Sequence, residues 1–231
     1  MVDKLTELAS KYCIDKGVGN YPTPSFQNVP VIQYPQSFTP FYDKFLNKHR
    51  NEFKNVLEIG VLFGNSLLCW SEYFSNAKIY GFDIDTSRVL DCANKFTILQ
   101  GDQSKREDLQ NLISSSCDSF DLIIEDGGHK MHQQQISLGF LFEKVKSGGY
   151  FILEDIHTSL SPPGTWGILP DNSNNTLDML KKYNSTGKIN SVHILESEKK
   201  YLESHIDFCE IWYTHSSGRV KPSVTSIIKK I

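Results

Sequence analysis

The sequence predicts an α/β fold: a Rossmann-like, doubly wound and mostly parallel seven-stranded sheet with an antiparallel C-terminal edge pair. Short apolar runs rich in β-branched and aromatic residues alternate with segments whose apolar residues recur at helical spacing. This alternation is typical of a parallel sheet with helices on both faces. The last two strand candidates are joined by about a dozen residues rather than by a clear helix, which favours an antiparallel pair.

The expected elements follow one another closely along the chain. The expected strands span residues 55–59, 78–83, 96–99, 120–124, 150–153, 191–195 and 207–213. The expected helices span residues 65–73, 86–93, 104–113, 131–146 and 176–183. Gly148 and Gly149 should end the fourth of these helices before the fifth strand begins. The residues after Gly218 are rich in Lys and Arg and are expected to form a solvated terminus.

The chain of 231 residues is long enough for one α/β domain with a full core. We expect this sheet domain to span residues 51–231, preceded by an arm over residues 1–50. The arm begins with a short helix, becomes rich in proline and aromatic residues, and leads into a helix that starts at Thr39. Two readings stay open: a lid over the crevice, or an arm docked on the core or on a second subunit of a homo-oligomer.

Composition argues against several classes of partner. The formal net charge is -3, so no basic field would attract nucleic acid or an anionic membrane surface. No apolar run approaches the roughly 18–20 residues needed to span a bilayer, and the first residues do not resemble a signal segment. Five cysteines at wide spacings favour free thiols in a reducing compartment. A cytoplasmic protein is expected.

A glycine-containing turn follows the first strand. Glu58, Gly60 and Gly64 form an E-x-G-x-x-x-G pattern, with Ser66 at the start of the next helix. Glycines at such a turn let the backbone approach a ligand closely. A dinucleotide fingerprint needs a further glycine, so the pattern favours a nucleoside ligand without a pyrophosphate.

Polar residues at the ends of the next two strands could read that nucleoside. Asp83 ends the second strand, where an acid accepts hydrogen bonds from ribose hydroxyls, and Asp85 is its competitor. Asp102 and Gln103 follow the third strand, where an adenine would lie. The alternative for Asp83 is a strand-end acid that faces solvent or caps the next helix. The alternative for Asp102 is a residue that starts the next helix.

The fourth and fifth strands both end in acids. Asp126 follows the fourth strand, with His129 three residues later, and Glu154 and Asp155 follow the fifth. Because parallel strands open their C-terminal ends on one crevice, these side chains should meet there. Each has a structural alternative, since Asp126 could serve only the cofactor and a Glu-Asp pair could cap a turn.

In their order, these motifs resemble the class I S-adenosylmethionine-dependent methyltransferases. The segments I-I-E-D-G-G-H-K-M-H-Q-Q and G-G-Y-F-I-L-E-D-I-H-T-S are similar to those of the metal-dependent macrolide and rhamnosyl sugar O-methyltransferases, with the cephalosporin hydroxylase group as relatives. The resemblance covers roughly residues 38–160. It implies that S-adenosylmethionine binds at Glu58, Gly60, Gly64, Ser66, Asp83, Asp102 and Gln103.

The same resemblance assigns a metal and a base. It implies Asp126, Glu154 and Asp155 as ligands of Mg²⁺ or another divalent cation, and His129 as the catalytic base beside Asp126. The family's H-x-Y-T-P-x-Y segment corresponds to residues 36–42, where Phe38 replaces a tyrosine and removes its hydroxyl. His132 and His157 are nearby competitors for the base.

The chemistry agrees with an O-methyltransferase. A sugar hydroxyl is a poor nucleophile, so the enzyme must place it in line with the sulfonium methyl and assist its deprotonation. A carboxylate site suits Mg²⁺, which would stabilise alkoxide charge. We expect a sugar, glycoside or nucleotide-sugar acceptor, with residues 159–175 and 17–41 shaping its pocket. The rival readings are a nicotinamide-dependent oxidoreductase and a non-catalytic cofactor-binding subunit.

Overall fold

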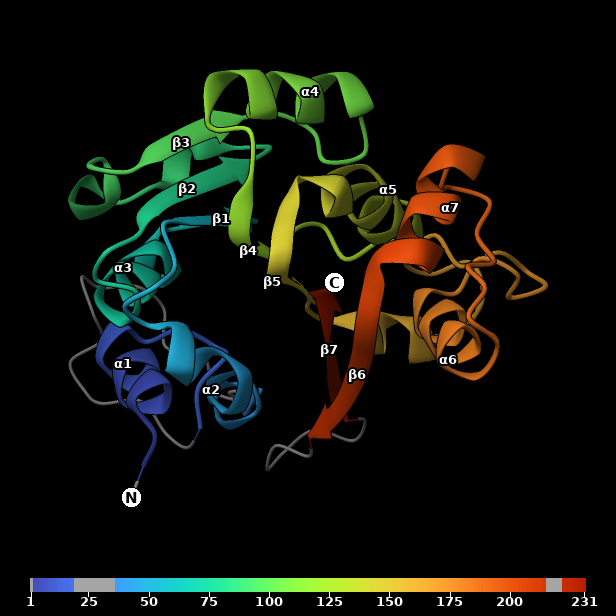
Figure 1. Ribbon diagram of the computed structural model, residues 1–231, viewed down its shortest axis with the longest axis horizontal. Coiled ribbons are helices and arrows are strands. Elements are labelled where there is room, and N and C mark those ends of the chain that lie inside the picture. The colour runs from blue at the N-terminus through green and yellow to red at the C-terminus, as the bar shows by residue number, and fades with distance from the viewer. Residues whose placement is uncertain (1, 19–35, 215–221) are drawn as a thin grey trace.

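A computed structural model describes residues 2–18, 36–214 and 222–231 of the chain. Seven strands form one sheet in the order β3-β2-β1-β4-β5-β7-β6 (Figure 1). The strands are β1 Asn55–Ile59, β2 Lys78–Asp83, β3 Thr97–Gln100, β4 Phe120–Glu125, β5 Val145–Leu153, β6 Ile206–Thr214 and β7 Ser223–Lys230. Strands β1 to β5 run parallel, whereas β7 is antiparallel to both β5 and β6. The predicted fold class is confirmed.

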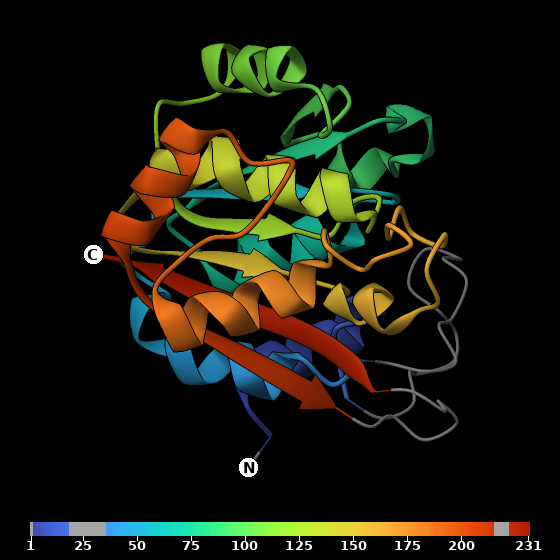
Figure 2. The same ribbon diagram turned by 90° about the vertical axis from the view of Figure 1, so that its right-hand side faces the viewer.

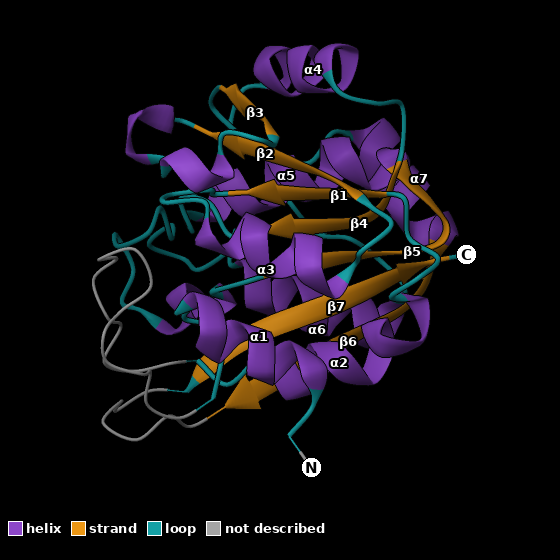
Figure 3. Cartoon of the chain, turned by 90° about the vertical axis from the view of Figure 1, so that its left-hand side faces the viewer, coloured by secondary structure: helices purple, strands orange, loops and turns teal. Residues whose placement is uncertain are grey.

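Helices cover both faces of this sheet. They are α1 Lys4–Tyr12, α2 Thr39–Leu46, α3 Asn65–Tyr73, α4 Arg106–Ser115, α5 Met131–Leu141, α6 Thr176–Thr186 and α7 Glu196–His205. Helices α1, α2 and α3 lie on one face (Figure 3), and α5, α6 and α7 lie on the other (Figure 2). Each face has its own apolar core, because successive strand side chains point in opposite directions. In β5, Tyr150 and Ile152 join the first core, and Phe151 and Leu153 join the second.

The sheet's C-terminal pair differs in detail from the prediction. The antiparallel strands are β6 and β7, and β7 lies between β5 and β6. The tail expected to be solvated is therefore a buried strand, in which Lys230 Nζ donates to the carbonyls of Glu143 and Val145 at 2.9 and 2.6 Å. The lysines of this segment made it look like an exposed tail in the sequence, although most side chains of the strand are buried.

The predicted strand over residues 191–195 is wrong. The hydroxyl of Ser191 accepts hydrogen bonds from the backbone N–H groups of His193 and Ile194, at 3.0 and 3.1 Å. Such local side-chain bonds compete with strand pairing. Helix α7, which the sequence reading missed, follows directly.

Two predicted helices are shorter than expected. Over residues 86–93 the chain forms two 3₁₀ turns, Thr86–Arg88 and Asp91–Ala93, instead of one α-helix. The Asp85 carboxylate accepts a hydrogen bond from the backbone N–H of Ser87, and such a local bond competes with α-helical hydrogen bonding. Helix α5 ends at Leu141 rather than at residue 146. Gly148 and Gly149 lie inside β5, where its pairing with β4 shifts register, so they accompany a bulge and not a helix end.

The N-terminal residues belong to the core on one face. Leu5 and Leu8 of α1 and Phe41 and Tyr42 of α2 are buried. The helix expected from Thr39 is confirmed. The lid or arm reading concerns chiefly residues 19–35, which lie outside the described residues, and the division at residue 50 stays a prediction. Within the part of the chain that the structure describes, no helix is long and apolar enough to cross a bilayer.

Candidate active site

A cavity of about 570 Å³ opens at the C-terminal ends of the parallel strands. Its wall contains the turn after β1, the ends of β2 and β3, the turn after β4, and residues 13–16 of the N-terminal segment. This is the edge where ligands bind in open α/β sheets. The volume falls within the range of small-molecule and cofactor sites, which is about 300–1,000 Å³.

The glycine turn is shaped by contacts within the chain. Gly60 has φ +88°, and a Cβ there would lie 1.9 Å from the backbone oxygen of Asp126. Gly64 has φ +80°, and its Cβ would lie 2.6 Å from Cβ of Ala93. The glycines are therefore required by the packing of this turn on the turn after β4, whatever ligand the cavity binds.

Glu58 anchors the next helix from beneath the turn. Its carboxylate is fully buried and accepts hydrogen bonds from Ser66 Oγ at 2.5 Å and Trp70 Nε1 at 3.2 Å. Burial raises the pKa of Glu58, although Lys16 and these two donors oppose the shift. Ser66 lines the cavity, whereas Glu58 is not part of its wall.

Asp83 fixes the same turn from the end of β2. Its Oδ2 accepts hydrogen bonds from the backbone N–H groups of Val61 at 2.6 Å and Leu62 at 2.9 Å. Asp83 lines the cavity, whereas Asp85 is turned toward Ser87 and is absent from the cavity wall. Of the two competing acids, only Asp83 lines the cavity.

Asp102 and Gln103 also line the cavity. Asp102 Oδ1 accepts from Ser104 N and Oγ at 2.9 and 2.6 Å, and the Ser104 hydroxyl lowers the pKa of Asp102 although burial opposes it. Helix α4 begins at Arg106, four residues after Asp102, so Asp102 closes a turn and does not cap the helix.

Gln103 supports the turn after β4. Its buried amide donates to Glu125 and to Ser137 Oγ at 3.2 Å, and its Oε1 accepts from the Gly128 backbone at 2.9 Å. A Cβ on Gly127 would lie 1.7 Å from that oxygen. These internal bonds hold the D-G-G-H turn against the cavity.

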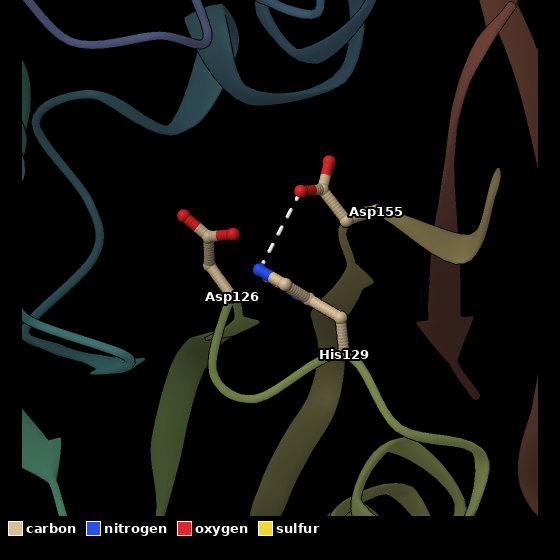
Figure 4. Close-up of side chains that lie close together, drawn as sticks. All are labelled: Asp126, His129 and Asp155. Atoms are coloured by element: carbon tan, nitrogen blue, oxygen red, sulfur yellow. Dashed lines mark ion pairs between the residues drawn. The ribbon is translucent and has the colours of Figure 1, made fainter. Parts of the chain in front are cut away.

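Asp126, His129 and Asp155 converge at the predicted crevice. One ligand atom from each lies within 4.8 Å of the others, a spacing that a single metal ion can bridge. The three side chains point toward one another from the turn after β4 and the end of β5 (Figure 4). His129 Nε2 lies 3.5 Å from Asp155 Oδ2.

Backbone strain accompanies this convergence. His129 and Asp155 have φ values of 57° and 53°, in the left-handed region that such residues seldom adopt. Strain of this kind gathers at functional sites, where the surrounding structure holds it in place. Burial alone would lower the pKa of His129, but the carboxylates of Asp155, Asp126 and Glu125 outweigh it and raise that pKa.

Glu154 is not part of this group of three residues. Its carboxylate is fully buried and faces the ammonium group of Lys16, with Oε2 and Nζ 3.2 Å apart. Lys16 also pairs with Asp126. Sequence reasoning missed Lys16 because it lies in a short turn 110 residues before Asp126, and no local pattern marks it.

The donors suit a hard divalent cation. Carboxylate oxygens from Asp126 and Asp155 are the ligands that Mg²⁺ and Mn²⁺ prefer, and one imidazole is compatible with Mn²⁺. Asp155 Oδ1 and His129 Nδ1 are buried without a hydrogen-bond partner among the described residues. Buried polar atoms that lack partners are consistent with an ion or water bound near each of them.

The two competing histidines have different neighbours. His157 Nδ1 is 3.6 Å from Asp155 Oδ1, closer to the acids than its place on a loop suggested. His132 packs instead against His193, with ring centroids 6.0 Å apart. His157 is therefore the nearer neighbour of the two.

The segment before the sheet is buried rather than exposed to an acceptor. Phe38 is fully buried, and the Tyr42 hydroxyl is 2.7 Å from Thr225 Oγ1. The loop after β5 reaches the site instead. Trp166 is 43% exposed, and its ring centroid lies 6.3 Å from that of His129.

Residues 57–156 match the family model described as a methyltransferase domain. Over 141 residues, the chain is 36% identical to the mycinamicin VI 2''-O-methyltransferase of Micromonospora griseorubida, covering 58% of this chain and 35% of that protein. It is 30% identical over 190 residues to the 8-demethyl-8-alpha-L-rhamnosyl tetracenomycin-C 2'-O-methyltransferase of Streptomyces olivaceus, covering 78% of this chain and 45% of that one.

The fold is similar to that of a solved structure. The MycE methyltransferase of the mycinamycin biosynthetic pathway, in complex with Mg, SAH and mycinamycin VI, superposes with a TM-score of 0.71 at 26% identity. The match covers 99% of this chain and 54% of that one. The chain spans from about a third to about half the length of these relatives. The resemblance expected from the sequence is confirmed.

Proposed function

We propose that this chain, which carries a methyltransferase domain over residues 57–156, is a divalent-metal-assisted O-methyltransferase. Its methyl donor is S-adenosylmethionine, and its acceptor is a hydroxyl of a sugar on a glycosylated small molecule. The observation that carries the proposal is the group formed by Asp126, His129 and Asp155, which adjoins the cavity bounded by Asp83. Donor and acceptor would thus meet at the ends of β4 and β5.

The donor half of the site follows from the cavity. Asp83 lies where it can accept hydrogen bonds from ribose hydroxyls through the lone pairs that its backbone donors leave free. The exposed side chains of Leu62 and Ile84 stand beside it and can cover the flat face of an adenine. Asp126 borders both the cavity and the acid group, so the donor's methyl end would face the acceptor.

The acceptor half follows from the acids and the histidine. Asp126 and Asp155 would hold Mg²⁺ or Mn²⁺, whereas Glu154, the third ligand that the sequence predicts, faces Lys16. A bound cation would supply charge that favours the deprotonated form of a sugar hydroxyl. His129 would take the hydroxyl proton at Nε2, and the negative charge of Asp155 would stabilise the resulting imidazolium. Trp166 offers an exposed aromatic face for the sugar beside that nitrogen.

The relatives support the acceptor class. The similar proteins are named for methylating sugars on macrolide or tetracenomycin products. We therefore rank glycosides above nucleotide sugars as acceptors. A homo-oligomer and a cytoplasmic location stay predictions; the described residues form no disulfide bond, which is consistent with the second.

The rival readings have less support. The dinucleotide-binding order 3-2-1-4-5-6 has no antiparallel strand between its last two positions, whereas β7 occupies that place here. A non-catalytic subunit would have no need for an imidazole held between carboxylates in a strained backbone.

The test is an acceptor screen with a labelled methyl donor. We expect methyl transfer to deoxysugar glycosides, such as the mycinamicin and tetracenomycin series, in Mg²⁺ and its loss in excess EDTA. Thermal shifts with S-adenosylhomocysteine and NAD provide a check that needs no acceptor. A ligand at about a hundred times its Kd stabilises by roughly 2.7 kcal/mol. Stabilisation by NAD alone, or full turnover in EDTA, would contradict the proposal.

A further inference from the structure

One lysine is buried at the centre of the acid-rich crevice. The side chain of Lys16 is 2% exposed, and its Nζ forms an ion pair with Asp126 and lies 3.2 Å from Glu154 Oε2. The same atom lies 3.7 Å from Asp15 Oδ1 and 3.8 Å from Glu58 Oε1. Four carboxylates therefore surround one ammonium group.

The backbone holds this lysine firmly in place. The carbonyl of Lys16 accepts hydrogen bonds from the N–H groups of Phe38 and Thr39 at 2.9 and 3.1 Å. Asn65, at the start of α3, donates to the carbonyl of Tyr12 at 2.9 Å. Lys16 also lines the cavity proposed for the methyl donor. It therefore borders both this cavity and the group formed by Asp126, His129 and Asp155.

Charge complementarity keeps the lysine ionised. Burial alone would lower the pKa of Lys16, but Asp126, Glu154 and the other two acids outweigh it and raise that pKa well above its usual value. A buried ion of this kind is tolerated only when opposite charges compensate it. Its positive charge must also act on any cation bound nearby, since charges a few ångströms apart interact strongly in a partly buried site.

The contacts also divide the acids into two sets. Asp126 meets Lys16 through Oδ2 and remains within the group that contains Asp155. Glu154 faces Lys16 and lies outside that group. Lys16 is therefore the cationic group that Glu154 faces.

We propose that Lys16 is a positioning residue of the cation site: its ammonium group retains Glu154, limits the crevice to one divalent ion at Asp126 and Asp155, and weakens the binding of that ion. The inference rests on the proposed function, because it concerns the same metal. It assigns the N-terminal segment a direct part in the site, through a residue that touches both halves of it.

The experiment is a calorimetric titration of the full chain with Mn²⁺, in the presence of S-adenosylhomocysteine and without acceptor. Lys16→Met removes the charge while keeping similar bulk, and we expect Mn²⁺ to bind about tenfold or more tightly. Lys11→Met is the matched control, because Lys11 is exposed and pairs with Glu72 instead. It should bind Mn²⁺ as the wild type does. Unchanged or weaker binding by Lys16→Met would overturn the proposal.

A second pair of variants covers the case in which Lys16→Met does not fold. Glu154→Gln keeps the lysine without its partner and should bind Mn²⁺ more weakly than wild type. Lys16→Met combined with Glu154→Gln removes both charges and should bind more tightly than Glu154→Gln alone. Equal affinities for these two variants would overturn the role of Lys16.

The wild type separates this inference from the proposed function. If wild type binds no Mn²⁺, the metal-assisted function fails. A site that then appears in Lys16→Met would still support the lysine as the resident cation, and its absence there would overturn both. If the wild type binds Mn²⁺ but removal of the Lys16 charge does not tighten that binding, only the role of Lys16 fails.

Discussion

The imidazole Nε2 of His129 lies 3.5 Å from Oδ2 of Asp155, a distance that fits two roles. The nitrogen could be a ligand beside the carboxylate, or a base that the carboxylate orients. One nitrogen cannot do both, since a metal-bound nitrogen has no lone pair left for a proton. The two roles predict different behaviour when the imidazole is removed.

We expect His129→Ala to lower kcat by about 10²–10⁴-fold, the contribution typical of a general base. Mn²⁺ affinity should change little in this variant, whereas Asp155→Asn should lower both kcat and Mn²⁺ affinity. Steady-state kinetics and calorimetry measure the two quantities. His132→Ala is the control, because that ring packs against His193. Loss of Mn²⁺ binding in His129→Ala would make the histidine a ligand instead.

Asp83 should matter for the donor in two ways. Its Oδ2 holds the backbone of Val61 and Leu62, and it faces the expected ribose position. Hydrogen bonds to a charged group contribute about 1.5–3 kcal/mol each, so Asp83→Asn should weaken S-adenosylhomocysteine binding by about 10- to 100-fold. Asp85→Asn makes the same change on an exposed acid outside the cavity wall and should have little effect. Equal losses would refute the assignment.

Gly60 gives a prediction about stability. Gly60→Ala places a Cβ 1.9 Å from the Asp126 carbonyl oxygen in a residue with φ +88°. The backbone must shift, and we expect a loss of about 4 kcal/mol or more in unfolding free energy. Gly148 also has a positive φ, but a Cβ there meets nothing within 4 Å. Gly148→Ala should therefore cost about 1–2 kcal/mol. Urea unfolding compares them, and similar costs would contradict the packing argument.

The central sheet could be predicted because its signals are local. Strands β1, β2 and β4 are mostly buried runs of β-branched and aromatic residues, and each ends in, or is followed by, a glycine or an acid. Strand β7 lacked such a signal, since its sequence ends in two lysines and begins with Ser, Val and Thr. Its place between β5 and β6 depends on pairing with residues up to some 80 positions away, and no local pattern encodes that pairing.

The site could be predicted only in part for the same reason. Asp126 and Asp155 follow strands, so their meeting follows from sheet topology. The difference between Asp155 and its neighbour Glu154 does not, because it depends on the left-handed backbone at Asp155. Lys16 enters from a distant turn and forms an ion pair with Glu154. The roles assigned to all these residues stay predictions.

Acid should destabilise the fold through a pair of histidines. Burial lowers the pKa of both His132 and His193. The charge of Lys130 lowers the pKa of His132 further. The charges of His132 and Arg106 lower the pKa of His193 further. Asp102 opposes the shift at His132. The unfolded chain therefore binds these protons more readily than the folded chain does. Their contribution to stability is full above the usual histidine pKa of about 6.5 and is lost as pH falls through the lowered folded values.

The measurement is the unfolding free energy in urea between pH 8 and pH 5. We expect His193→Asn to lose less stability, or to gain more, than the wild type on acidification, because the substitution removes one of these groups and relieves the other. Groups whose pKa burial raises, such as Asp126, change stability in the opposite direction and do so in both proteins. Both rings are half-buried, so the difference should be modest. Identical pH dependence in the two proteins would show that this pair makes no contribution.

Trp166 should affect the acceptor and leave the donor unaffected. Its ring is 43% exposed beside His129, in a residue with φ 52° whose carbonyl accepts from the Met131 N–H at 2.9 Å. This fixed orientation keeps an apolar face open next to the expected base. We expect Trp166→Ala to raise KM for the glycoside acceptor by about tenfold, the effect of losing roughly 1.4 kcal/mol of binding. S-adenosylhomocysteine affinity should be unchanged. Trp212 is similarly exposed at 45% but stacks on Phe41, so Trp212→Ala is the matched control. An equal rise in KM for the two variants would rule out a sugar-binding role for Trp166.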